Sequence, residues 1–126
     1  MLRRFASAAM IASIAVTCAA VVIVLLPGSV REHAMPILLA WVCLPSIWGL
    51  WAMLAPEGWA AEKLPLWGSL LGLFAGVAAV FIVDAPGRLF GLQGNFAARI
   101  GIVVAFCGFY YLMWIAVRAV LRSLSA

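Results

Sequence analysis

Charged side chains are scarce in this sequence of 126 residues. Lys, Arg, Asp and Glu together make up 10% of the chain and there is one histidine, whereas 68% of the residues are hydrophobic. A soluble domain is about half apolar and about a quarter charged, and a chain this short cannot hide so much apolar surface from water. The composition therefore excludes a soluble domain and a disordered chain, and it predicts an integral membrane protein.

Cysteine is also rare, since only Cys18, Cys43 and Cys107 occur and no two of them form a C-x-x-C motif. This scarcity excludes a disulfide-rich secreted module. All three lie in apolar runs, at similar depth if those runs cross a membrane. Converging thiolates would suit a soft metal such as Cu(I), but cysteine in packed helices usually behaves as a small apolar residue. We therefore expect no bound metal and no other cofactor.

Ionisable residues are missing from the middle of every long apolar run. Transporters coupled to protons or ions normally place such a group at mid-membrane depth, so a small drug/proton antiporter is disfavoured. The sequence also contains no phosphate-binding glycine loop, no nucleophile motif and no metal-ligand spacing. We therefore expect no catalytic residues and a protein that is not an enzyme.

Four apolar runs are present, each of about 20 residues, which is the length that crosses a ~30 Å hydrocarbon core as a helix. They cover residues 5–26, 35–55, 64–83 and 99–121. Proline, glycine and acidic residues separate them, and these residues favour turns. The first run is longer than the ~7–15-residue apolar core of a cleaved signal peptide, so we expect it to be retained. The sequence predicts an all-α protein, with residues 1–126 forming one domain of four transmembrane helices in a small bundle.

The basic residues predict the orientation of these spans. One side of the membrane would hold five of them: Arg3, Arg4, Lys63, Arg118 and Arg122. The other side would hold three: Arg31, Arg88 and Arg99. Because Lys and Arg concentrate on the cytoplasmic side, both termini are expected there, in a membrane of the bacterial inner type. The net charge of +4 then reflects topology and lipid contact, with no nucleic-acid partner. Five tryptophans, Trp114 among them, are predicted at the cytoplasmic interface.

Small residues recur on single helix faces and predict close helix packing. The third span carries Gly68, Gly72 and Gly76 at intervals of four, and the first carries an alanine face that includes Ala8 and Ala12. Small residues let helix backbones approach closely in lipid. The glycine face is either an interface with another chain or, within this chain, a surface for the alanine face of the first span. Gly101 and Gly108 also share one face of the fourth span.

The second span contains Pro45, which removes a backbone hydrogen bond and is expected to kink the helix. Trp41 and Trp48 lie seven residues apart, hence on one face of an uninterrupted helix. Such a pair can face a pigment, quinone or lipid ligand, although aromatic bulk against lipid or in the core is commoner.

The stretch from Asp84 to Arg99 is the longest connection and the most polar, and it includes Arg88 and Phe90. Its mixture of arginine, aromatic and glycine residues suits the headgroup zone, as a lipid-anchored connection or as an outer-face contact for a partner. Asp84 would pair with Arg88 if the segment turns helically, or with Arg99 across the connection. The single histidine, His33, is expected in the first outer loop.

These observations lead to three functional hypotheses. The first is a non-catalytic accessory or assembly subunit of a larger membrane protein complex, acting through helix and lipid packing. The alternative is a small homo-oligomeric transporter, channel or lipid-handling protein, suggested by the glycine face and the Pro45 kink. The third and weakest is an enzyme on a lipid or isoprenoid substrate that uses outer-face polar groups, namely Glu32, His33, Asp84 and Arg88.

Overall fold

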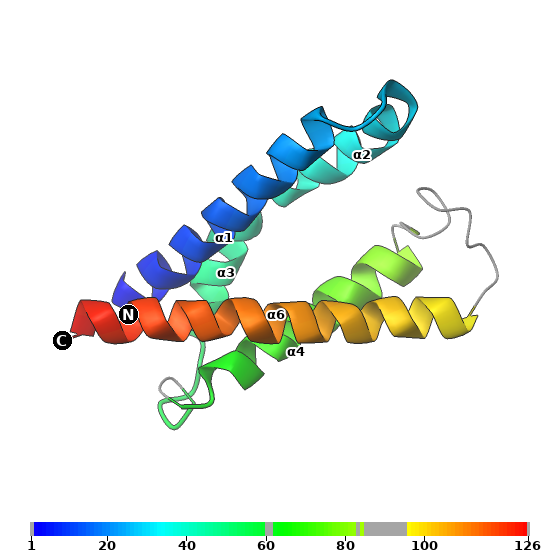
Figure 1. The fold of residues 1–126 in the computed structure, drawn as a ribbon. Coiled ribbons are helices and arrows are strands. Elements are labelled where there is room, and N and C mark those ends of the chain that lie inside the picture. Colours follow the sequence, from blue (N-terminus) through cyan, green and yellow to red (C-terminus); the bar gives the residue numbers. More distant parts are fainter. Residues whose placement is uncertain (1, 60–61, 83, 85–95, 126) are drawn as a thin grey trace. The chain divides into compact units, whose positions relative to one another are not determined.

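The chain is helical throughout the part that the structure describes (Figure 1). This computed structural model describes residues 2–59, 62–82, 84 and 96–125, without the side chains of residues 30, 33, 37 and 125. Of the described residues, 87% are helical and none lies in a strand. The predicted all-α class is thereby confirmed for these residues.

The chain divides into two compact units. Residues 1–54 together with 120–126 form the first, which we call the N-terminal unit, and residues 55–119 form the second, which we call the hairpin unit. The last helix runs through both sets of residues. The sequence predicted a single domain of four helices.

Three helices make up most of the N-terminal unit: α1 (Leu2–Val24), α2 (Gly28–Trp41) and α3 (Leu44–Met53). Helix α1 packs against both α2 and α3. The closest approach of α1 and α3 is marked by Gly49, where an added Cβ would lie 2.5 Å from the Phe5 ring. The glycine therefore leaves the space that this ring fills.

The second span is broken and not merely kinked. Val42 and Cys43 form a turn between α2 and α3, with 3.4 Å hydrogen bonds from their N–H groups to the carbonyls of Leu39 and Ala40. Pro45 lies in the first turn of α3, where its missing N–H costs little. In a continuous helix the same proline would leave the Trp41 carbonyl without its donor, so the chain ends one helix and starts another.

Helix α2 also begins earlier than the predicted second span. The Pro27 carbonyl accepts a 2.9 Å hydrogen bond from the Arg31 N–H, which closes the first turn directly after the proline. The expectation that Arg31, Glu32 and His33 lie in an outer loop was therefore wrong, since all three belong to the first turns of α2. Pro27 limits this helix at its start because its backbone is extended, with ψ of 148°.

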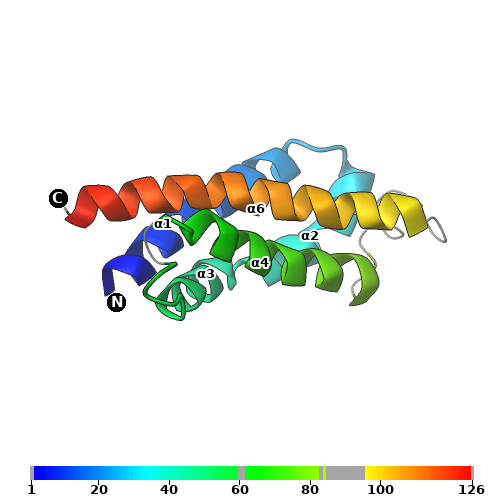
Figure 2. The same cartoon turned by 90° about the horizontal axis from the view of Figure 1, so that it is seen from below.

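The hairpin unit is built from α4 (Leu64–Val77), the π-helical segment η1 (Ala78–Ile82) and α6 (Phe96–Ser125). Helices α4 and α6 lie side by side and antiparallel (Figures 1 and 2). Helix α6 begins before the predicted start of the fourth span, so Arg99 is inside a helix and not in a connection. With 30 residues, α6 is about 45 Å long and exceeds a ~30 Å hydrocarbon core.

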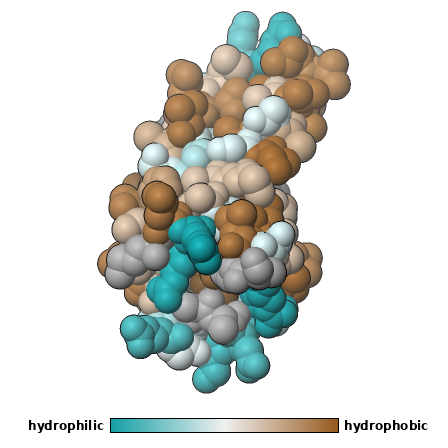
Figure 3. Space-filling view, turned by 90° about the vertical axis from the view of Figure 1, so that its left-hand side faces the viewer, coloured by the Kyte–Doolittle hydropathy of each residue, from teal (hydrophilic) through white to brown (hydrophobic). Residues whose placement is uncertain are grey.

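Four helical stretches are long and apolar enough to cross a membrane: Leu2–Val24, Ala34–Met53, Leu64–Ile82 and Phe96–Leu124. They coincide with the four predicted runs. Large apolar side chains remain on the surface of every one of them, for example Val22, Leu50, Phe74 and Leu112, and apolar side chains cover much of the face in Figure 3. Such a surface suits lipid or protein and is unsuited to water.

Candidate functional site

The glycine face of α4 is the closest helix contact in the hairpin unit. A Cβ added at Gly68 would overlap the Trp114 ring, and one at Gly72 would lie 2.7 Å from the Tyr110 Cβ and 2.9 Å from the Phe106 carbonyl oxygen. At Gly76 the added atom would lie 3.1 Å from the Phe106 Cβ. Three glycines thus form a groove along α4 that receives three aromatic residues of α6.

The partner of this groove differs from the one expected. Sequence analysis proposed the alanine face of the first span, whereas the atoms nearest to each of the three glycines belong to α6. A Cβ-free groove accommodates large rings, and α6 offers Phe106, Tyr110 and Trp114 at intervals of four along one face. That periodicity was the signal that sequence analysis missed. Trp114 itself is fully buried, and its predicted depth at the cytoplasmic interface stays a prediction.

The alanine face of the first span is buried within the structure as well. Ala8 and Ala12 have almost no exposed surface, and Ser7 beside them is buried too. The Ser7 hydroxyl donates a 2.7 Å hydrogen bond to the Arg3 carbonyl oxygen of its own helix. This bond satisfies the polar group, so the face presents small and apolar surface.

An ion pair closes one end of the hairpin unit. Arg99 donates from Nη2 to Asp84 Oδ1 at 2.7 Å and from Nη1 to the Val80 carbonyl oxygen at 2.7 Å. Its side chain is 15% exposed and that of Asp84 36%. Arg99, one of the two partners considered for Asp84, is bound to it. Arg88 and Phe90, the other predicted outer-face contacts, lie outside the described residues.

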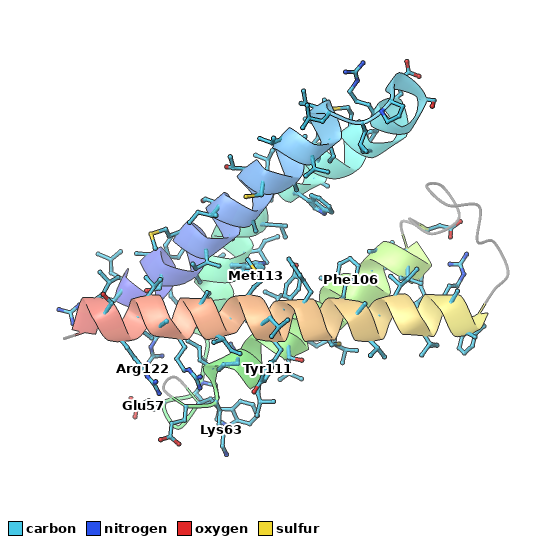
Figure 4. All side chains as sticks on the ribbon, in the orientation of Figure 1. Glu57, Lys63, Phe106, Tyr111, Met113 and Arg122 are labelled. Carbon is cyan, nitrogen blue, oxygen red and sulfur yellow. The ribbon has the colours of Figure 1, made fainter. Side chains whose placement is uncertain are left out.

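At the opposite end of the hairpin unit, Arg118 links α6 to the connection that precedes α4. Arg118 donates from Nη1 to the Glu62 carbonyl oxygen at 2.9 Å, and the Lys63 ammonium lies 5.5 Å from the centre of the Trp59 ring. The Glu57 and Lys63 side chains project from this connection in Figure 4. Arg99 and Arg118 are 19 residues apart on α6, about 28 Å along a helix, which matches the ~30 Å hydrocarbon thickness.

The back of α6, opposite the aromatic face, is open within the described residues of the hairpin unit. Gly101 and Gly108 lie there, and a Cβ added at either would meet no atom within 4 Å. Ala97, Val104 and Leu112 are exposed on the same side of the helix. We call these five residues the small-residue stripe.

The predicted ligand-facing aromatics belong to two successive helices. Trp41 is the last residue of α2 and Trp48 lies inside α3, with the turn at residues 42–43 between them, and their ligand-facing role stays a prediction. Trp48 is also buried, whereas Trp41 is partly exposed.

The thiols do not form a cluster either. Cys18 and Cys43 are exposed and Cys107 is partly exposed. Among the described residues, no three His, Cys, Asp or Glu side chains lie close enough together to hold a metal ion. The structure therefore brings together apolar side chains, one ion pair and hydrogen-bonded arginines. Such contacts are suited to packing and anchoring.

Comparison with known proteins adds no relative. The sequence matches no family model, no curated protein and no solved structure. The function must accordingly be argued from the packing surfaces themselves.

Proposed function

We propose that this chain is a non-catalytic accessory or assembly subunit of a larger membrane protein complex, held in a bacterial inner membrane with both termini in the cytoplasm. Its work is to present helix surfaces to partner helices and to lipid. The proposal rests on one observation, the small-residue stripe on α6.

The stripe carries the proposal because, within the described residues of the hairpin unit, nothing packs against its glycines. Glycine inside a helix costs about 1 kcal/mol relative to alanine. At Gly68, Gly72 and Gly76 the seated aromatic rings of α6 account for that cost. At Gly101 and Gly108 the open surroundings do not. Close approach of another helix would explain them, since small residues are where helices meet in lipid.

The contacts of Arg99 and Arg118 support the same proposal in a different way. Arg99 and Arg118 use their guanidinium groups on acceptors within the hairpin unit, and their spacing would place them at the two membrane surfaces. We therefore attribute an anchoring role to these two arginines. The exposed helical surface between them is apolar, which suits contact with partner helices.

Purification in a mild detergent followed by mass spectrometry of the co-purifying proteins tests the proposal. The wild-type chain should be recovered with a defined membrane partner, and Gly101→Ile and Gly108→Ile should lose that partner because the added side chain blocks close approach. Ala40→Ile adds a side chain at an exposed position of α2 and should retain it.

Two outcomes would contradict the accessory role. Recovery of the wild-type chain as a monomer would leave the small-residue stripe without a partner. Recovery only as a self-oligomer would favour the alternative, a small homo-oligomeric transporter, channel or lipid-handling protein.

A further inference from the structure

The end of α4 departs from α-helical geometry at η1, the five residues Ala78–Ile82. A π-helix uses i→i+5 hydrogen bonds in place of i→i+4, so a π turn holds one residue more than an α turn. Such segments are rare and often coincide with functional positions. A π turn persists only where its surroundings compensate for the loss of α-helical geometry.

Arg99 supplies that compensation from the facing helix. In an α-helix the Val80 carbonyl would accept the backbone N–H of Asp84, four residues on. Here Nη1 of Arg99 donates to that carbonyl at 2.7 Å while Nη2 holds the Asp84 carboxylate, also at 2.7 Å. One rigid guanidinium therefore bridges two acceptors and sets the spacing between them.

The backbone at Asp84 fits the same arrangement. Asp84 has a φ of 56°, the left-handed conformation, which aspartate and asparagine tolerate better than most side chains do. A residue in that conformation ends a helix, so Asp84 cannot continue α4. The carboxylate is then presented to α6 at the point where the helix ends.

The π segment also decides which side chains of this turn face outward. Val80 is fully buried, whereas Phe81 is 46% and Ile82 78% exposed. The Phe81 ring lies 6.3 Å from the Phe96 ring at the start of α6. Removing one residue from the turn would shift the residues that follow by about 100° and 1.5 Å. Phe81 would then take roughly the outward place of Ile82, and Ile82 would turn toward α6.

We propose that the Asp84–Arg99 ion pair is a conformational lock that holds η1 in the π register, and that breaking the pair converts this turn to α-helix and reorients Phe81 and Ile82. Anything that competes for either charge therefore changes the direction in which these two side chains face. This inference is independent of the small-residue stripe and of the accessory role.

The test measures the oxygen accessibility of nitroxide labels by electron paramagnetic resonance, with the full chain in phosphatidylcholine vesicles. Cys18, Cys43 and Cys107 are replaced by alanine, and single labels are attached at Phe81→Cys or Ile82→Cys. With the lock intact, the label at position 82 should be the more accessible of the two. Asp84→Asn, which keeps a side chain suited to the left-handed backbone, and Arg99→Gln should each invert that order.

Glu57→Gln is the matched control, because it removes an exposed carboxylate elsewhere in the hairpin unit (Figure 4). It should leave the order of positions 81 and 82 unchanged. An unchanged order in both lock variants would overturn the proposal, as would inversion in only one of them. A rise at both positions together would mean fraying of the helix end and would overturn it as well.

Discussion

Gly68 and Gly101 are the same residue type in opposite surroundings. Gly68 faces the Trp114 ring with no room for a Cβ, whereas Gly101 faces open space. A substitution that is harmless at one position is therefore a steric conflict at the other. The comparison separates glycines that the fold needs from glycines that it does not.

Gly68→Ala is expected to destabilise the hairpin unit by roughly 1–3 kcal/mol, the usual cost of forcing extra atoms into a packed contact. Gly101→Ala should instead be neutral or stabilise α6 by up to about 1 kcal/mol, because alanine is the better helix former. Unfolding of the purified chain in mixed detergent micelles measures both. Equal effects at the two positions would contradict the described packing.

Trp114→Ala provides a second prediction at this scale. Removing a fully buried tryptophan is expected to cost about 3–5 kcal/mol. In that background Gly68→Ala should cost much less than in the wild type, since the ring that it would strike is absent. A double-mutant cycle on the same unfolding measurement reports this coupling, and strictly additive effects would argue against direct contact.

At the scale of elements, the break between α2 and α3 is the clearest departure from a regular span. It lies near the middle of the apolar stretch Ala34–Met53, at Val42 and Cys43. Carbonyls without donors are costly in a hydrocarbon environment. The turn limits that cost because the N–H groups of Val42 and Cys43 each donate to the carbonyl three residues back.

Pro45→Ala restores an N–H that can donate to the Trp41 carbonyl, so α2 and α3 are expected to join into one helix. Amide hydrogen exchange, followed by mass spectrometry on peptides covering residues 41–47, should slow as a result. Pro36→Ala is the matched control, because Pro36 lies within α2 without interrupting it. Unchanged exchange after Pro45→Ala would show that tertiary contacts, and not the proline, impose the break.

At the scale of the whole molecule, the four apolar helices suggest a membrane location. The distribution of basic residues predicts how the chain is oriented in that membrane. The predicted orientation places Glu57 and Ser123 on the cytoplasmic side and Glu32 on the outer side. Polar residues at both ends of each span fit such a placement. The apolar surface between them is available to lipid and to partners.

Single cysteines at Glu57, Ser123 and Glu32 in the cysteine-free chain test this orientation. A membrane-impermeant maleimide should label Glu32→Cys in intact cells, and label Glu57→Cys and Ser123→Cys only after the membrane is opened. The opposite pattern would invert the topology, which rests on five basic residues against three.

The number of helices long and apolar enough to cross a membrane followed from the sequence, because this is a local property, set by the length of an apolar run against bilayer thickness. Helix starts were less predictable. Arg31 was expected in a loop and lies within α2, and α6 begins three residues before Arg99, the predicted start of the fourth span, because hydropathy does not report the hydrogen bonds that stabilise a charged residue at a helix end.

The sequence by itself determined that this chain is helical, apolar and built from four stretches of membrane-spanning length, because composition and run length act residue by residue. Only the tertiary structure decided which faces are used. It assigned the Gly68–Gly72–Gly76 groove to the aromatic face of α6, paired Arg99 with Asp84, and left Gly101 and Gly108 open. Those choices depend on which side chains meet across helices, and periodicity along one helix does not contain that information. Of the few charged residues, Asp84, Arg99 and Arg118 make hydrogen bonds at the two ends of the hairpin unit.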